Sequence, residues 1–196
     1  MPPSQPLTSA AAQHFVGFVE TTTDALRLIM AARQGIIPRI TRRLNDSERR
    51  SMIRSGAVFV FCVEESGIKR WTEGLAWSPS RIVGNFLVYR EVTERNSSRG
   101  AERGPVTPGT ATRSLDASGT LRANGLIKKT ITVKVDGTDH HLVSYYRDED
   151  VRLGHLPRPT TRPDIMALTI PPEMVRGTNF RHPPHIEIDS DGRARM

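Results

Sequence analysis

The sequence has a single cysteine among its 196 residues, Cys62. One thiol forms no internal disulfide and cannot build a cysteine-based zinc finger. Cys62 lies in the apolar run at residues 57–63, so we expect it to be a core residue. No apolar stretch reaches the roughly 18 residues that a membrane-spanning helix needs, so we expect a soluble intracellular protein without a membrane partner.

The motifs of common enzyme chemistry are also missing. The sequence has no G-x-S-x-G nucleophile elbow, no P-loop and no G-x-G-x-x-G pattern, and its acidic residues form no evident carboxylate pair. His140 and His141 are adjacent, so on a strand they point apart and cannot share a metal ion without ligands from elsewhere. The sequence therefore predicts a protein that is not an enzyme and that needs neither a cofactor nor a metal.

Lysine is scarce although the protein is basic. Lysine and arginine total 28 against 21 acids, and only four of the 28 are lysine. Guanidinium groups pair with phosphate in a bidentate manner and stack on bases, so an arginine-rich protein suggests a nucleic-acid partner. GC-rich coding also enriches arginine, so composition alone leaves a merely solvated surface equally open.

Two helices and a strand are predicted in the first half of the chain. Apolar residues recur at helical spacing between the hydroxyl-rich segment 21–24 and Gly35, which indicates an amphipathic helix. Asn45, with Glu48 three residues later, is a predicted N-cap of a second short helix. The apolar run 57–63 then predicts a buried strand.

The second half contains the clearest hairpin of the sequence. Branched and aromatic residues alternate on both sides of Asp136 and Gly137, a pair typical of a tight turn between antiparallel strands. The other expected elements are a return strand at 68–71, a strand at 86–89, a helical turn at 148–153 and a last strand at 165–170.

Neither half has enough strands for a core of its own. The segment between them is rich in Ser, Gly, Thr, Arg and Pro and has almost no large apolar residue. We therefore predict an α+β fold, a single intertwined domain with a mainly antiparallel sheet assembled from two sequence blocks plus short helices. The expected divisions are a flexible lead-in at 1–13, a first block at 14–93, a disordered linker at 94–123, a second block at 124–170 and a proline-rich tail at 171–196.

A long segment carries a resemblance to a known family. Residues 66–82 read Ser-Gly-Ile-Lys-Arg-Trp-Thr-Glu-Gly-Leu-Ala-Trp-Ser-Pro-Ser-Arg-Ile, and this run resembles the signature of the WOPR (Gti1/Pac2) family of fungal transcriptional regulators. Residues 126–131 and 140–146 resemble the second block of the family. The resemblance implies a nuclear, sequence-specific regulator that binds A/T-rich double-stranded DNA and controls fungal development, morphology or pathogenicity, with transcriptional co-regulators as further partners.

The predicted DNA-binding residues are basic side chains near the two tryptophans, an arginine cluster before the second helix, and one lysine of the hairpin. They are Arg70, Arg81, Lys69, Arg39, Arg42, Arg43 and Lys128. An arginine inserted in a narrow A/T-rich minor groove gains affinity from its strong negative potential. For Trp71 and Trp77 we expect a core position, because large aromatic side chains bury most of their area. A charge run such as residues 39–54 is more often just a solvated face.

Two further hypotheses remain open from the sequence. Lys69 and Arg70 stand at the spacing that basophilic kinases favour before Thr72, which makes Thr72 a candidate phosphosite, although an ordinary threonine at a strand end fits equally well. The alternative to sequence-specific DNA binding is a basic module that binds RNA or protein without DNA sequence specificity.

Overall fold

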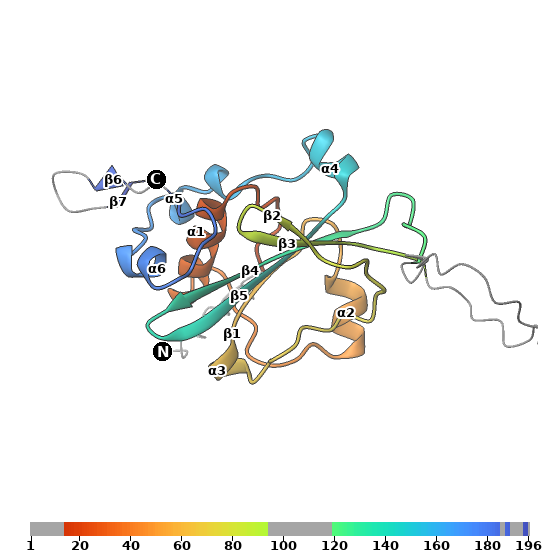
Figure 1. Cartoon of the computed structure of the whole chain (residues 1–196), viewed down its shortest axis with the longest axis horizontal. Coiled ribbons are helices and arrows are strands. Elements are labelled where there is room, and N and C mark those ends of the chain that lie inside the picture. Colours follow the sequence, from red (N-terminus) through yellow and green to blue (C-terminus); the bar gives the residue numbers. More distant parts are fainter. Residues whose placement is uncertain (1–13, 94–118, 185–186, 189–193, 196) are drawn as a thin grey trace, which may run out of the picture.

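The computed structural model describes residues 14–93, 119–184, 187–188 and 194–195. The predicted lead-in at 1–13 and most of the predicted linker lie outside the described residues. Five strands form one antiparallel sheet in the order β1-β5-β4-β3-β2 (Figure 1). The first block contributes β1 (Val58–Cys62), β2 (Arg81–Val83) and β3 (Phe86–Arg90), and the second contributes β4 (Ile127–Val135) and β5 (Thr138–Tyr146).

The β4–β5 hairpin lies between β1 and β3, so the second block fills the centre of a sheet whose two edges come from the first. This arrangement confirms the predicted single intertwined α+β domain. At the hairpin turn Asp136 has φ 49° and Gly137 has φ 79°. Two consecutive positive φ angles define the turn type that matches strand twist, and the aspartate–glycine pair tolerates them.

Short helices complete the domain. They are α1 (Thr22–Arg33), α2 (Asp46–Met52), α3 (Val63–Ser66), α4 (Asp148–Arg152), α5 (Pro163–Met166) and α6 (Pro172–Arg176), with a 3-10 turn at Pro159–Thr161. Both predicted N-caps are present, since Thr21 and Asp24 form a capping box on α1 and Asn45 and Glu48 form one on α2. Two short strands, β6 (Glu187–Ile188) and β7 (Ala194–Arg195), pair with each other. None of the helices in the described part of the chain is long and apolar enough to cross a membrane.

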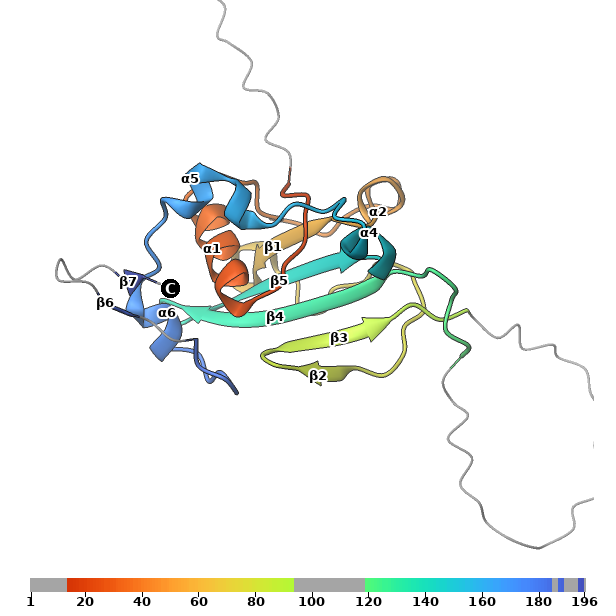
Figure 2. The same ribbon diagram turned by 90° about the horizontal axis from the view of Figure 1, so that it is seen from above.

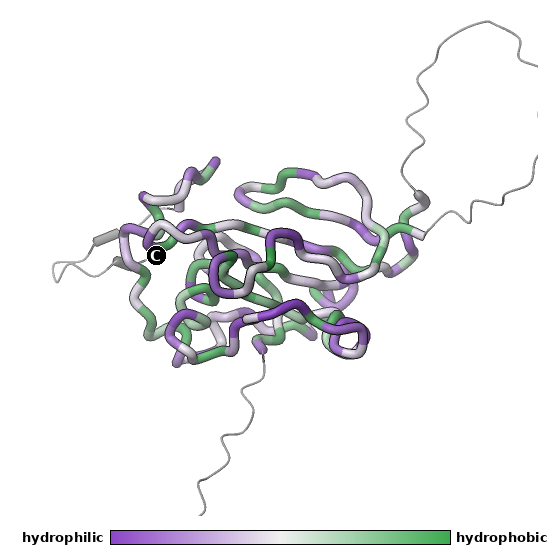
Figure 3. Tube along the Cα trace, turned by 90° about the horizontal axis from the view of Figure 1, so that it is seen from below, coloured by the Kyte–Doolittle hydropathy of each residue, from purple (hydrophilic) through white to green (hydrophobic). Residues whose placement is uncertain are grey.

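Both faces of the sheet are covered. Val58 and Val60 pack in a cluster with α1, whereas Phe59 and Phe61 pack in a second cluster with Tyr145. Figure 2 shows α1 and α5 together along one side of β1, β5 and β4. Figure 3 shows hydrophobic stretches mainly in the interior and hydrophilic segments in the outer turns. Burial on both faces explains why the run 57–63 is apolar at consecutive positions.

Two expected strands are absent from the described chain. Residues 68–71 were predicted as the return strand of β1, but the free edge of β1 is already bonded by other segments. Ile40 donates its backbone N–H to Val60 at 2.8 Å, and Val16 bridges Ala57. The predicted last strand at 165–170 is also wrong, because Pro163 begins the helix α5 there.

The ordered domain extends beyond both predicted boundaries of the second block. Leu121 bridges Val92, although the linker was expected to run to residue 123. Met174 of α6 is fully buried in the core cluster of α1, although residues 171–196 were expected to form a tail. Met174 and Val175 are only two adjacent apolar residues shortly after two prolines, too few to form the periodic pattern that would predict burial.

Candidate nucleic-acid interface

Residues 67–80 make up most of the run that resembles the family signature. They lie on the face of the sheet where Phe59, Phe61 and Tyr145 form the second cluster. Trp71 stacks on Phe61 with ring centroids 5.4 Å apart. Its indole Nε1 donates a 2.6 Å hydrogen bond to the hydroxyl oxygen of Tyr145, a fully buried residue of β5. Burial, with the negative charge of Glu73 adding to it, raises the pKa of Tyr145. Trp71 therefore anchors the segment to the second block, as expected for a largely packed tryptophan.

A buried ion pair fixes the same segment two residues further on. The ammonium of Lys128 lies 2.7 Å from the carboxylate Oε1 of Glu73, and the exposed fractions of the two side chains are 11% and 2%. The ammonium also stands 4.7 Å from the ring centroids of both Trp77 and Tyr89. Lys128 was expected to face solvent and contact DNA, but its charge is held inside the protein by Glu73.

The neighbouring lysine points to the opposite face of β4. Lys129 is 7% exposed, and its ammonium donates to the carbonyl oxygens of Val19 and Glu20 at 2.8 and 2.9 Å. It also lies 4.1 Å from the centroid of the Phe86 ring. Burial lowers the pKa of Lys129 to about 8. The alternation of a strand thus buries both lysines, on different faces.

The exposed guanidinium groups of Arg70 and Arg43 meet at one pocket. This Arg70 pocket has a volume of about 140 Å³ and is lined by Arg43, Leu44, Arg49, Ile68, Arg70, Trp71 and Thr72. Arg49 pairs with Asp46 one turn away on α2. Neither Arg43 nor Arg70 forms an ion pair within the part of the chain that the structure describes. The pocket therefore combines two uncompensated cations, which attract an anion at close range.

Two other predicted arginines are bonded to carboxylates of the protein. Arg39 Nε donates to Glu65 at 2.6 Å. Both terminal nitrogens of Arg42 donate hydrogen bonds to the Glu48 carboxylate, at 2.9 and 2.7 Å. This fork, together with the backbone N–H of Asn45, lowers the pKa of Glu48 to about 2. The cluster 39–43 is thus divided between Arg39, which is paired with α3, Arg42, which holds the start of α2, and Arg43, which has no such partner among the described residues.

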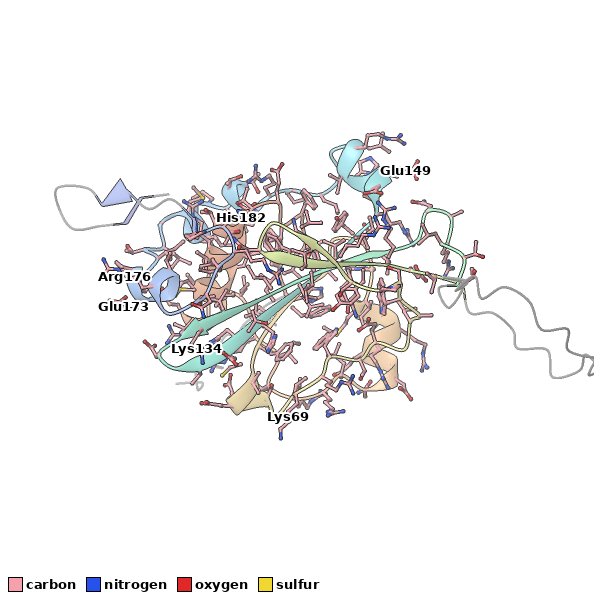
Figure 4. All side chains as sticks on the ribbon, in the orientation of Figure 1. Lys69, Lys134, Glu149, Glu173, Arg176 and His182 are labelled. Carbon is pink, nitrogen blue, oxygen red and sulfur yellow. The ribbon has the colours of Figure 1, made fainter. Side chains whose placement is uncertain are left out.

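Lys69 and Arg81 are exposed but lie apart from the pocket lining. Figure 4 shows Lys69 extending from the outer end of the segment after α3. Arg81 is the first residue of β2, all three residues of which are exposed, at the sheet edge opposite β1. The structure therefore brings only Arg43 and Arg70 of the predicted residues together.

Three basic residues that we did not single out from the sequence border two further depressions beside α2. Arg50 of α2 lines one of them, while Arg147 of the second block and Arg122, at the end of the predicted linker, line the other. Arg50 lies within the charge run 39–54, in which nothing in the sequence distinguishes it from its neighbours. Arg147 is one exposed arginine after β5, and only the fold brings it near α2, where its backbone N–H donates to Ser55 Oγ at 3.0 Å.

Metal-ligand chemistry is not assembled in the described residues, which contain no group of three or more His, Cys, Asp or Glu side chains that could hold a metal ion. His141 stacks on Phe61, and burial is the main cause that lowers the pKa of both His140 and His141. The two imidazoles therefore take part in packing on opposite faces of β5.

Comparison with known proteins gives consistent matches. The Gti1/Pac2 family profile matches residues 14–113 and 107–147. The global transcription regulator sge1 of Gibberella fujikuroi is 38% identical over 86% of this chain and 62% of its own length, so the chain spans under two thirds of that relative. The cAMP-independent regulatory protein pac2 of Schizosaccharomyces pombe is 32% identical over 90% of this chain and 91% of its own.

Solved structures match as well. The WOPR domain of Wor1 from Candida albicans, in complex with a 13-base-pair double-stranded DNA, has a TM-score of 0.63 at 34% identity. That match covers 85% of this chain and 98% of the Wor1 chain. A complex of the same domain with a 17-base-pair duplex has a TM-score of 0.61 at 34% identity and covers 82% of this chain and 95% of that chain.

Proposed function

Because this chain belongs to the Gti1/Pac2 family, we propose that it is a nuclear transcriptional regulator that binds A/T-rich double-stranded DNA in a sequence-specific manner. The relatives are called transcription regulators, and the similar WOPR domain of Wor1 is described in two complexes with double-stranded DNA. Control of fungal development, morphology or pathogenicity and contact with co-regulators belong to the same proposal. They concern the activity of the whole protein and rest on the same family membership.

The observation that carries the proposal is the Arg70 pocket. Arg70 is exposed and directly precedes Trp71, whose ring and indole nitrogen are fixed by Phe61 and Tyr145. A guanidinium on a fixed backbone loses little conformational entropy on binding, so more of its interaction energy remains as affinity. Arg43 stands at the same pocket and adds a second positive charge.

Arg70 suits groove recognition, and Arg43 suits the adjacent phosphates. A narrow A/T-rich minor groove concentrates negative potential, and an arginine side chain placed there reads groove width. Phosphate contacts position a protein on the duplex and carry no sequence information. We propose that Lys69 and Arg81 make further contacts of this second kind. Arg39, Arg42 and Lys128 act indirectly, because their charges hold neighbouring segments in place.

The test compares Arg70→Ala with Arg176→Ala. Arg176 is an exposed arginine of α6, and α6 lies at the opposite end of the molecule from α2 (Figures 1 and 2). We expect Arg70→Ala to weaken binding to the preferred A/T-rich duplex by about 1 to 3 kcal/mol and binding to a scrambled duplex by less. Arg176→Ala should bind like the parent. Fluorescence anisotropy at one salt concentration, on proteins of equal melting temperature, gives these affinities.

The same titrations distinguish sequence-specific DNA binding from the alternative function, a basic module without DNA sequence specificity. Equal affinity of the parent for A/T-rich duplex, scrambled duplex and single-stranded RNA would support a nonspecific basic module instead. An Arg70→Ala protein that retains both the affinity and the discrimination of the parent would remove Arg70 from the recognition surface.

A further inference from the structure

A groove continues from the Arg70 pocket along α2 to the second block. Two adjoining depressions form it, and we call them together the α2 groove. The first, of about 370 Å³, shares Arg49 with the Arg70 pocket, and the second, of about 400 Å³, shares Ile53 and Leu75 with the first. The groove therefore leads from Arg70 to Arg147, which stand 77 positions apart in the chain.

The charges along this groove are unbalanced. Arg50 and Arg147 are exposed, and neither forms an ion pair with any residue that the structure describes. The acids of the same lining are already engaged: Glu73 binds Lys128, and Glu91 binds both Arg122 and the backbone N–H of Leu126. The third, Asp46, is exposed but pairs with Arg49 on the same helix. The side chains of Glu73 and Glu91 are only 2% and 7% exposed, so they offer little negative surface to a ligand.

Apolar side chains lie between these arginines. Ile53 and Leu75 line both depressions, and Leu126 lines the second. Nucleic-acid backbone alternates charged phosphates with sugars that have apolar faces. Arginines at intervals, separated by aliphatic side chains, match that alternation. A purely solvated face would instead intersperse its arginines with several exposed acids, whereas this lining has one, Asp46, which is paired with Arg49.

We propose that the α2 groove holds a stretch of sugar–phosphate backbone of the same duplex that the Arg70 pocket contacts, with Arg50 and Arg147 as phosphate contacts. This inference rests on the proposed function and extends its surface to the second sequence block. Phosphate contacts set affinity and register, so the two arginines hold the duplex while Arg70 distinguishes its sequence.

The experiment measures salt dependence. Arg50→Ala, Arg147→Ala and the double variant are compared with the parent and with Arg176→Ala on the preferred duplex. Each phosphate contact contributes about 0.9 to the slope of log affinity against log salt. We therefore expect the slope of each single variant to be smaller by about 0.9, which corresponds to roughly eightfold weaker binding at 0.1 M monovalent salt. The double variant should bind about sixtyfold more weakly than the parent at the same salt concentration. Discrimination between preferred and scrambled duplex should stay as in the parent.

A conservative pair of variants separates charge from packing. Arg147→Lys keeps the positive charge, so its salt slope should stay close to that of the parent. Arg147→Gln should lose the contribution of one phosphate contact, about 0.9 of slope, at an unchanged melting temperature. Equal slopes for parent, Arg50→Ala and Arg147→Ala, together with a normal Arg70 dependence, would refute the α2 groove alone. A parent that fails to prefer duplex over single-stranded RNA would refute the proposed function. Unchanged duplex binding with lost capture of an acidic peptide would assign the groove to a protein partner and overturn the inference.

Discussion

Lys128→Met distinguishes a buried ion pair from a DNA contact. In the structure the Lys128 ammonium neutralises Glu73, whose side chain is 2% exposed. Removing one partner of a buried pair leaves the other charge uncompensated in a medium of low dielectric, which costs about 3 to 5 kcal/mol. Small domains are stabilised by only about 5 to 15 kcal/mol in total. For a chain of this length, such a loss lowers the melting temperature by roughly 10 °C.

The reasoning predicts a specific pattern in a double-mutant cycle. Lys128→Met should be strongly destabilised, whereas Lys128→Met combined with Glu73→Gln should regain much of that loss, because no buried charge then remains unpaired. Urea unfolding monitored by tryptophan fluorescence gives the four free energies. The coupling energy of neighbours in one network is typically about 0.5 to 3 kcal/mol.

The salt dependence of DNA binding by Lys128→Met tests the alternative interpretation, in which Lys128 contacts DNA. A phosphate contact at Lys128 would lower the salt slope by about 0.9 with little change in stability. We expect the reverse, a slope equal to that of the parent when binding is measured well below the melting temperature. A Lys128→Met protein that melts like the parent and loses slope would refute the buried-pair interpretation and restore Lys128 to the DNA surface.

Two further predictions concern pH and modification. The pKa of Lys129 is about 8 in the folded protein against an ordinary 10.5, so the unfolded chain binds more protons between these values and stability rises with pH. The parent should gain about 2 kcal/mol between pH 7 and 9.5 relative to Lys129→Met in urea unfolding, and parallel curves would contradict the burial of the charge. Phosphate on Thr72 would place about 1.5 to 2 negative charges at the pocket of Arg43 and Arg70 and should weaken duplex binding. Kinase-treated parent and Thr72→Ala are compared by anisotropy, and equal affinities would exclude this regulation.

Local chemistry in the sequence predicted the elements whose causes are local. The capping boxes at Thr21 and Asn45 and the turn at Asp136 need only a few neighbouring residues, and the structure contains all three. The return strand at 68–71 failed for a reason that no local pattern contains. Its place beside β1 is taken by Val16 and Ile40, and this competition is decided by the whole fold.

The candidate site shows the same division. Exposure and charge of Arg70 follow from the motif, but the pairing of Lys128 with Glu73 spans 55 positions and depends on the β3–β4 register. By strand alternation Lys128 shares a face of β4 with Thr132 and Lys134, and both of these residues are exposed. What alternation could not reveal is that residues 73–77 cover the Lys128 end of this face.

The intertwined topology gives this coverage a functional consequence. Both polar anchors of the Arg70 segment lie in the second block, because Trp71 bonds to Tyr145 of β5 and Glu73 bonds to Lys128 of β4. The first block alone contains Arg70 and the ring of Phe61 under Trp71 but lacks these two polar partners. A mobile arginine loses more conformational entropy on binding than a fixed one. This loss reduces the binding free energy that remains for discrimination between sequences. Assembly of the two blocks therefore converts a basic segment of the first block into a fixed recognition element. The same assembly completes the α2 groove, because the second block adds Arg147 to its lining.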